Sequence, residues 1–337
     1  MEKKATISDI ARAVGVSKTT VSRYLNGNYG YMSDATRARI AEVIAQYGYV
    51  PSSVARTLKS KRSHLVGVIV NSLRYQIGAQ TVTQINEVCM SRGYGTVVWC
   101  TDDDPDRESE AIQSCLNQQV DGIIIIPCTE DVGRYAAICA GGVPTVLCTR
   151  PIPRWPYGSV NVRHDALIRT LLSHLSEQGF EKARFLVDVD NFHKVSMATA
   201  FSDGAARLFG MSPEESVVYV GMDEGGVNAA LKCFLGEYPG QKKAVVAVNT
   251  HTLFLTLRYL EQHGISVPDG AGVCGYDALG WSELVSPGIT SIHQPMDEMG
   301  RVAGEKLLAC LRDGSLGSGR TELDGTVTFR ASTLLRK

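Results

Sequence analysis

Residues 6–27 read TISDIARAVGVSKTTVSRYLNG, and this stretch decides how the N-terminal part of the chain folds. Apolar residues recur there at the spacing of one helix face: Ile7, Ile10, Ala11 and Val14. Thr6 and Asp9 are placed as a capping box, and Gly15 ends the helix. Ser17 can cap a second helix after a tight turn. The stretch predicts a helix-turn-helix, with an ordinary helical hairpin as the alternative.

The second predicted helix has one polar and cationic face, formed by Lys18, Thr19, Ser22 and Arg23. Its inward residues are Val21 and Leu25. A loop rich in Asn, Gly and Tyr then leads to a third helix, which Ser33 can cap and Gly48 ends. The apolar positions of this third helix repeat at three- and four-residue spacing: Ile40, Val43, Ile44 and Tyr47.

Charge separates this helical segment from the rest of the chain. Residues 1–62 carry eleven Lys and Arg against four Asp and Glu, a net charge of +7, whereas the whole chain of 337 residues carries −1. The remainder is therefore acidic, at −8. A basic head on an acidic body indicates binding to nucleic acid at one end only.

From His64 onward, apolar strands alternate with amphipathic helices, the pattern of a parallel α/β sheet. We expect four strands, a break near residues 151–158, and four more strands, at 65–70, 95–100, 122–126, 144–148, 183–187, 217–220, 244–248 and 272–275. Two doubly wound parallel-sheet subdomains follow from this pattern. Ligands bind such sheets at the carboxyl ends of the strands, so a ligand site is expected between the two.

The sequence contains none of the common catalytic motifs. No GxGxxG follows the first strand, and GxxxxGK[ST], GxSxG and HExxH do not occur, so we expect no enzyme, cofactor or metal site. The carboxylates of residues 102–104, before Pro105, are interpreted as a solvated helix start. Nine scattered cysteines without CxxC spacing indicate neither a disulfide framework nor a zinc site.

No apolar run approaches the roughly 18 residues that a membrane span requires. The start, MEKKATISDI, has no apolar signal region. A cytoplasmic protein that does not contact a membrane is therefore expected.

Residues 1–62 resemble the DNA-binding head of the lactose-repressor/galactose-repressor family of bacterial transcription regulators. The motifs that carry the resemblance are the stretch at 6–27, SDATRARI at 33–40, GYVP at 48–51 and ARTLK at 55–59. The rest of the chain resembles the family's periplasmic-binding-protein-type core through GVIV at 67–70, VDGIII at 120–125, GYD at 275–277 and PGITSIHQP at 287–295. Essentially the whole chain is covered.

The resemblance implies an α/β protein with an N-terminal all-α head and a periplasmic-binding-protein-like core. The head spans residues 1–50, a hinge helix or linker spans 51–62, and an effector-binding and dimerisation core spans 63–337. Within the core, the N-subdomain comprises about 63–160 plus 292–322 and the C-subdomain about 161–291 plus 323–337. The segment 296–311 is expected to return to the N-subdomain.

The resemblance also assigns DNA contacts. Base edges in the major groove are read by Lys18, Thr19 and Arg23. Phosphates are contacted by Thr6, Ser17, Thr20, Ser22, Asn26, Ser33 and Thr36, although simple helix capping is an alternative role for the capping residues. In the hinge, the minor-groove residues are Ala55, Arg56, Leu58 and Lys59. Leu58 is expected to enter as a wedge between base steps. The alternative is a flexible basic linker in which Leu58 packs on the core.

Two-fold symmetry predicts a homodimer on a pseudopalindromic operator of double-stranded DNA. The loop at 26–33 is one residue longer than the common family pattern, so half-site spacing cannot be transferred from relatives.

Effector contacts implied by the resemblance come from loops at the strand ends: Asn71, Arg74, Tyr75, Asp102, Thr149, Arg150, Arg163, His164, Met197, Asn249, Asp277 and Trp281. The chain departs from the family where Thr149, the pair Arg163 and His164, and Met197 replace common sugar-binding Asp, Asn and Arg residues. An Arg can clamp a carboxylate with two parallel hydrogen bonds, so these departures favour an anionic effector. The alternatives are a surface pair at 163–164 and a core aromatic at Trp281.

The segments YMSDATR at 31–37 and YDALGWSEL at 276–284 look most similar to regulators of ketodeoxygluconate and sugar-acid use. The sequence therefore predicts a sequence-specific DNA-binding transcriptional repressor of carbohydrate catabolism genes, controlled by a small-molecule sugar or sugar acid. The sequence is compatible both with an effector that releases the protein from DNA and with one that promotes DNA binding. The alternative is a solute-binding protein or an enzyme on the same core without DNA binding.

Overall fold

The computed structural model describes residues 5–49, 62–73, 76–188, 192–221, 223–276, 280–317 and 319–335. It divides into two compact units, Met1–His64 and Leu65–Lys337, which we call the head and the core. The predicted minor-groove residues of the hinge lie outside the described residues. None of the helices in the described ranges combines the length and the hydropathy that crossing a membrane requires.

The head consists of α1 (Ile7–Val14), α2 (Lys18–Leu25), the 3-10 helix η1 (Tyr29–Tyr31) and α3 (Asp34–Gln46). Thr6 and Asp9 form a reciprocal capping box at α1, and Gly15 ends this helix with a φ of 80°, a left-handed conformation that favours glycine. Ser17 and Ser33 cap α2 and α3. A small apolar core holds the three α-helices together through Ile10, Ala11, Val14, Val21, Ile40 and Val43. The predicted helices and caps are confirmed.

The core contains two six-stranded sheets. The first sheet is parallel throughout and has the order β11 (Arg320–Leu323), β5 (Gly158–Val162), β4 (Thr145–Cys148), β3 (Gly122–Ile125), β1 (Leu65–Val70) and β2 (Gly95–Cys100). The second has the order β12 (Thr326–Thr328), β10 (Thr290–His293), β9 (Gly272–Tyr276), β8 (Lys243–Ala247), β6 (Lys182–Asp188) and β7 (Val217–Val220), with only β12 antiparallel to its neighbour. The prediction of two doubly wound subdomains is confirmed.

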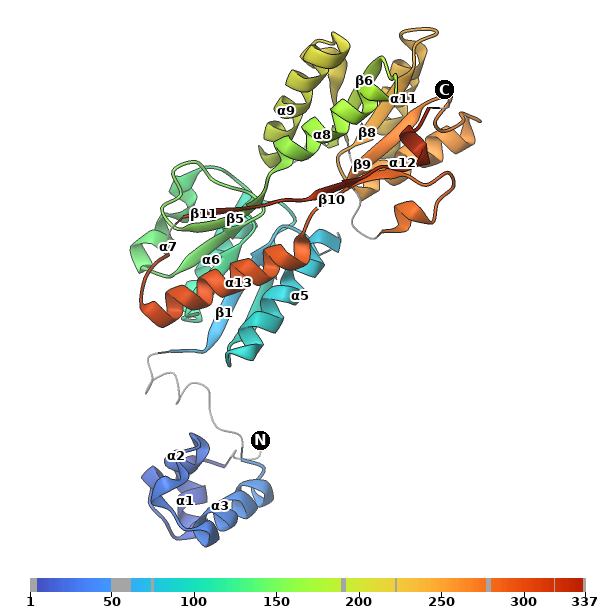
Figure 1. The fold of residues 1–337 in the computed structure, drawn as a ribbon. Helices are drawn as coiled ribbons and strands as arrows, with labels where there is room; N and C mark the ends of the chain where they lie inside the picture. Colours follow the sequence, from blue (N-terminus) through green and yellow to red (C-terminus); the bar gives the residue numbers. More distant parts are fainter. Residues whose placement is uncertain are drawn as a thin grey trace. The chain divides into compact units, whose positions relative to one another are not determined.

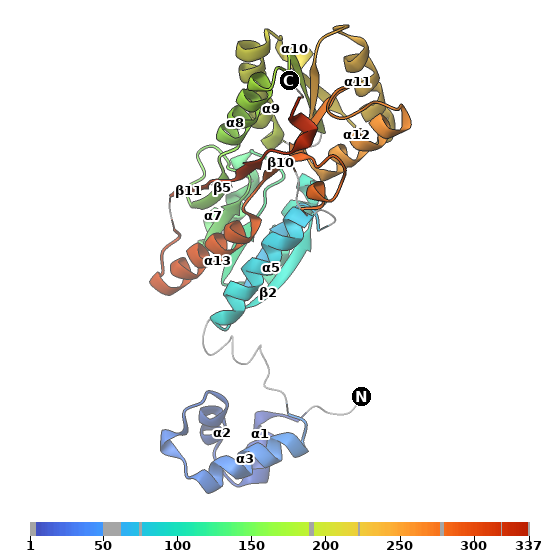
Figure 2. The same ribbon diagram turned by 45° about the vertical axis from the view of Figure 1, so that its right-hand side comes forward.

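Helices flank both sheets (Figure 1). The first half contains α5 (Gln76–Ser91), α6 (Pro105–Asn117), η2 (Val132–Tyr135), α7 (Ala136–Gly141) and α13 (Met296–Asp313). The second contains α8 (His164–Glu177), α9 (Phe192–Phe209), α10 (Pro213–Ser216), α11 (Glu224–Gly236), α12 (Thr250–Gln262), η3 (Trp281–Glu283) and η4 (Ala331–Thr333). As predicted, α13 returns to the first half, where it packs beside α5 (Figure 2). A Cβ at Gly300 of α13 would lie 2.5 Å from the Thr81 carbonyl oxygen of α5, so only glycine permits this approach.

The chain passes between the two halves at residues 162–164, 293–296 and 323–326 of the described core. These crossovers touch one another. Arg163 forms an ion pair with Asp324, and a Cβ at Gly325 would lie 2.5 Å from the carbonyl oxygen of His293. The crossovers therefore form one packed junction.

Of the twelve strands in the described residues, four were not among the eight predicted from apolar runs, although the family resemblance implies a last strand around 327–330, which overlaps β12. β5 begins in the segment where the sequence predicts a break. The strand was missed because Gly158, Ser159 and Asn161 interrupt its apolar pattern, although the whole strand is buried. β10, β11 and β12 are short and contain several polar residues. Apolar runs alone therefore do not reveal them.

Candidate nucleic-acid interface and effector site

The exposed face of α2 carries the three residues predicted to read bases. Lys18, Thr19 and Arg23 are all exposed, while Val21 on the opposite side is completely buried in the core of the head. Ser17 caps the N-terminus of the same helix, and its hydroxyl accepts a hydrogen bond from the backbone N–H of Thr20 at 3.1 Å. α2 thus presents a cationic surface whose orientation is fixed by packing and capping.

The predicted phosphate contacts occur mostly in pairs at helix ends. The hydroxyls of Ser17 and Thr20 are 3.0 Å apart, and those of Ser33 and Thr36 are 2.9 Å apart. The side-chain amide of Asn26 donates to the carbonyl oxygen of Ser22 at 2.7 Å. The caps and a phosphate contact are compatible, because a hydroxyl that accepts a backbone N–H can still donate its own proton.

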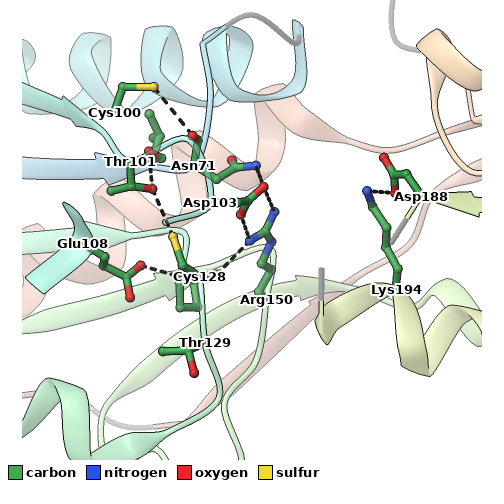
Figure 3. A network of polar contacts seen from close by, with 12 residues as sticks. Asn71, Cys100, Thr101, Asp103, Glu108, Cys128, Thr129, Arg150, Asp188 and Lys194 are labelled. Atoms are coloured by element: carbon green, nitrogen blue, oxygen red, sulfur yellow. Dashed lines mark hydrogen bonds and ion pairs between the residues drawn. The ribbon is translucent and has the colours of Figure 1, made fainter. Parts of the chain in front are cut away.

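In the core, a polar cluster lies at the carboxyl ends of the first sheet, and we call it the N-cluster: Asn71, Asp103 and Arg150. These residues follow β1, β2 and β4. Arg150 is nearly buried and donates to Asp103 through Nη1 at 2.5 Å and Nη2 at 3.4 Å, and Nη1 also donates to the Pro127 carbonyl oxygen at 2.9 Å. The Asn71 amide donates to the same carboxylate at 3.1 Å (Figure 3).

The backbone around the N-cluster is strained. Asp102, Asp103 and Thr149 all have positive φ, at 53°, 59° and 65°. Non-glycine residues rarely adopt this conformation, and strain of this kind gathers at functional sites. The interpretation of residues 102–104 as a solvated helix start is correct for Asp104, which caps α6, but wrong for Asp103, which pairs with a buried arginine.

A second cluster, the C-cluster, lies at the carboxyl ends of the second sheet and comprises Asp188, Lys194 and Asn249. Asp188 ends β6, and its carboxylate pairs with Lys194 of α9. The Asn249 amide donates to the other carboxylate oxygen at 2.7 Å, while its own oxygen caps α12. Each sheet therefore offers a carboxylate flanked by one cation and one amide. Figure 3 shows the N-cluster and the Asp188–Lys194 pair of the C-cluster.

A buried carboxyl supports the loop behind the N-cluster. Glu108 is 1% exposed, and it accepts hydrogen bonds from the Cys128 backbone N–H at 2.7 Å and from the Tyr135 hydroxyl at 2.6 Å. Burial raises the pKa of Glu108. The Cys128 thiol also lies 3.0 Å from the Thr101 hydroxyl. This network holds the segment in which the Pro127 carbonyl oxygen accepts a hydrogen bond from Arg150.

In the structure, both members of the predicted pair Arg163 and His164 have partners within the protein. Arg163 forms two parallel hydrogen bonds to Asp324, at 2.7 and 2.5 Å, and so belongs to the crossover junction. His164 is buried, with Nδ1 3.1 Å from the Tyr276 hydroxyl, and desolvation lowers its pKa to about 4. His164 therefore lacks the positive charge that the sequence argument requires, whereas the Arg163 side chain is 44% exposed and its contact with an anionic effector stays a prediction.

The other predicted effector residues differ in exposure. Met197 is buried in α9, Thr149 is half-buried, and Asp102 is exposed and pairs with Arg107 at 2.9 Å. Trp281 is half-buried and packs against the larger core cluster, in agreement with the core-aromatic alternative. Three further predicted residues lie outside the described ranges: Arg74, Tyr75 and Asp277.

Sequence reasoning missed Asp103, Asp188 and Lys194. For Asp188 a signal existed, because it directly follows the predicted strand at 183–187 and the carboxyl ends of strands carry ligand contacts. Lys194 comes from the first turns of α9, and no spacing pattern connects it to Asp188.

His164 predicts a pH dependence of stability. Its pKa is lower in the folded state than the ordinary value of 6.5, so the unfolded chain binds more protons as the pH falls toward 4. Between pH 6 and pH 5 this residue should cost about 1 kcal/mol of unfolding free energy. Urea titrations at both pH values measure the loss. The variant His164→Gln should show a shallower decline, and an unchanged pH dependence would contradict the assignment.

Comparison with known proteins agrees with this geometry. Residues 6–52 match the family described as "Bacterial regulatory proteins, lacI family", and residues 172–333 match the "Periplasmic binding protein-like domain". The HTH-type transcriptional regulator KdgR of Bacillus subtilis (strain 168) is 30% identical over 98% of this chain and 100% of its own length. The HTH-type transcriptional regulator PtxS of Pseudomonas plecoglossicida is 30% identical over 99% of this chain and 97% of its own length.

Among solved structures, the crystal structure of the lac repressor dimer bound to operator and the anti-inducer ONPF has a TM-score of 0.87 at 24% identity, covering 99% of this chain and 100% of that one. A helix-turn-helix head on a core of two facing parallel-sheet subdomains defines the class of DNA-binding transcriptional regulators. The chain belongs to the lacI family of bacterial regulatory proteins.

Proposed function

We propose that this regulator is a homodimeric repressor whose DNA binding is controlled by a sugar acid bound at the N- and C-clusters. The observation that carries the proposal is the matching chemistry of the two clusters: each sets a carboxylate, a cation and an amide at the carboxyl ends of a parallel sheet. Parallel α/β sheets bind their ligands at this edge.

The donor set suits a polyhydroxy carboxylate. Asp103, Asp188, Asn71 and Asn249 can accept from or donate to sugar hydroxyls. The planar guanidinium of Arg150 matches the geometry of a carboxylate. The carboxylate of the ligand would replace that of Asp103 as its hydrogen-bond partner. The resemblance of segments 31–37 and 276–284 to sugar-acid regulators supports the same ligand class.

On DNA, α2 is proposed to lie in the major groove with Lys18, Thr19 and Arg23 at base edges. We assign residues 51–62 to a hinge whose Leu58 enters the minor groove as a wedge. Each head would contact one half-site of a pseudopalindromic operator.

A second copy of the chain is proposed to cover apolar side chains on both halves of the core. Met90 of α5 and Phe254 of α12 are 64% and 53% exposed, and Leu284 is 84% exposed. Apolar side chains that gather into one exposed patch mark an interface. The lac repressor compared above is a dimer bound to operator, which supports the same assembly here.

Control by the effector would act through the crossover junction. A ligand that contacts both clusters favours one arrangement of the two halves of the core. It shifts the equilibrium between the arrangements only as far as its affinities for them differ. The Arg163–Asp324 pair and Gly325 lie where that change must be absorbed.

Isothermal titration calorimetry of the full-length chain tests the ligand class. Ketodeoxygluconate, gluconate and glucuronate are titrated in turn, with glucose and ribose as neutral sugars of similar shape. We expect heat from at least one acid, and a roughly 10- to 100-fold loss of affinity in Arg150→Gln, because a charge-assisted hydrogen bond is lost. Arg169→Gln, whose exposed partner is Asp165, is the control. Heat from a neutral sugar alone would reject the proposal.

A further inference from the structure

The loop between α2 and α3 carries two tyrosines outside the core of the head. Tyr29 and Tyr31 lie at the two ends of η1, and they are 38% and 81% exposed. Single exposed aromatic side chains are common, so exposure alone assigns no role. The contacts of the two rings are more informative.

Each ring lies against an arginine. The Cζ atom of Arg23 is 4.9 Å from the ring centroid of Tyr31, and that of Arg37 is 4.0 Å from the centroid of Tyr29. Both distances are within the range of cation–π attraction. Tyr29 also packs edge-to-face against Tyr24, with 5.8 Å between ring centroids. Tyr29 therefore joins the loop to α2 and α3, whereas Tyr31 extends the contact to a residue of the proposed base-reading face.

The backbone fixes the loop independently of the Tyr31 side chain. The backbone N–H of Asn28 donates to the carbonyl oxygen of Arg23 at 2.9 Å, and that of Met32 donates to the carbonyl oxygen of Tyr29 at 3.1 Å. Met32 is half-buried against the core of the head. Removal of the Tyr31 ring should therefore leave the path of the loop unchanged.

We propose that Tyr31 is a positioning residue that holds the Arg23 guanidinium in place for base recognition and so determines how strongly α2 discriminates between bases. The proposal rests on the base-reading role proposed above for Arg23. A guanidinium can lie with its face on an aromatic ring while its edge donates two hydrogen bonds to a guanine. Restricting a long side chain before binding also reduces the entropy that recognition costs.

The test uses the full-length chain and an operator selected from random duplexes, with single base pairs then changed in turn. Fluorescence anisotropy at one fixed salt concentration measures the affinity of Arg23→Ala, Tyr31→Ala, Tyr31→Phe and the double alanine variant. We expect Tyr31→Ala to lose roughly 5- to 30-fold in operator affinity and to relax discrimination at the base pair that Arg23→Ala identifies. Tyr31→Phe, which keeps the ring, should stay within about twofold of the parent protein.

The double variant is the decisive comparison. If Tyr31 acts through Arg23, Tyr31→Ala should have almost no further effect once Arg23 is alanine. Additive losses, an equal loss on an unrelated duplex, or a Tyr31→Phe loss as large as that of Tyr31→Ala would each overturn the proposal. An Arg23→Ala variant without any base-specific loss would instead refute the base-reading role itself, so the two failures can be told apart.

Discussion

Replacing Arg23 with alanine in the full-length chain is expected to lower operator affinity by roughly 30- to 10⁴-fold, because a bidentate contact to guanine is lost in both half-sites of a dimer. Affinity for an unrelated duplex should fall much less, since that binding depends on phosphate neutralisation. Fluorescence anisotropy with both duplexes at the same salt concentration measures the ratio. The expected signature is a loss of specificity rather than a uniform loss of binding.

Arg12→Ala is a matched control for this prediction. It removes the same charge from α1, where the Arg12 side chain is 82% exposed and lies 3.8 Å from Asp9. This variant should lower the affinity for the two duplexes by similar, small factors. If Arg12→Ala and Arg23→Ala reduce specificity equally, the exposed face of α2 is not the base-reading surface.

Replacing Asp103 with alanine is expected to lower the free energy of unfolding of the core by about 3 kcal/mol. The Arg150 side chain is only 6% exposed, so without Asp103 its charge stays in a poorly solvated position. The Pro127 carbonyl remains as a partner, and Asp103 is itself 25% exposed, so the lower end of the range for broken buried pairs applies. Urea denaturation followed by circular dichroism measures the change.

A double variant separates lost charge pairing from lost packing. Asp103→Ala combined with Arg150→Met removes both charges while keeping an apolar stem of similar length, and it should recover most of the lost stability. Losses that simply add would show that Asp103 does not compensate the buried charge of Arg150. Both variants should also abolish the heat of effector binding, because each removes part of the N-cluster.

The head could be predicted residue by residue because its signals are local. A cap, an apolar stripe and a terminal glycine lie within one or two helical turns, and Thr6, Ser17, Gly15 and Ser33 act in the structure as their spacing indicates. Aromatic contacts in the same head were not foreseen. Tyr31 meets Arg23 only because η1 folds the loop back toward α2, and no periodicity encodes that path.

The effector site could be predicted only as a location. The rule that ligands meet the carboxyl ends of parallel strands points to the edges where the N- and C-clusters lie, but it does not state which side chains pair there. Arg163 was expected to face a ligand, yet Asp324, 161 residues away along the chain, takes its guanidinium. Asp103 was set aside as solvated, yet Arg150 makes it part of a buried pair. Long-range partners of this kind become visible only in three dimensions.

The measurement that tests the account most directly follows DNA binding and effector binding together. Labelled fragments from upstream of the protein's own gene are titrated with the full-length chain across a salt series, with and without ketodeoxygluconate, gluconate and glucuronate, and fluorescence anisotropy is recorded. We expect tight, salt-dependent DNA binding that at least one sugar acid abolishes or creates. In Asp103→Ala, the acid should no longer change DNA binding. DNA binding that every sugar acid leaves unchanged in the parent protein would contradict the account.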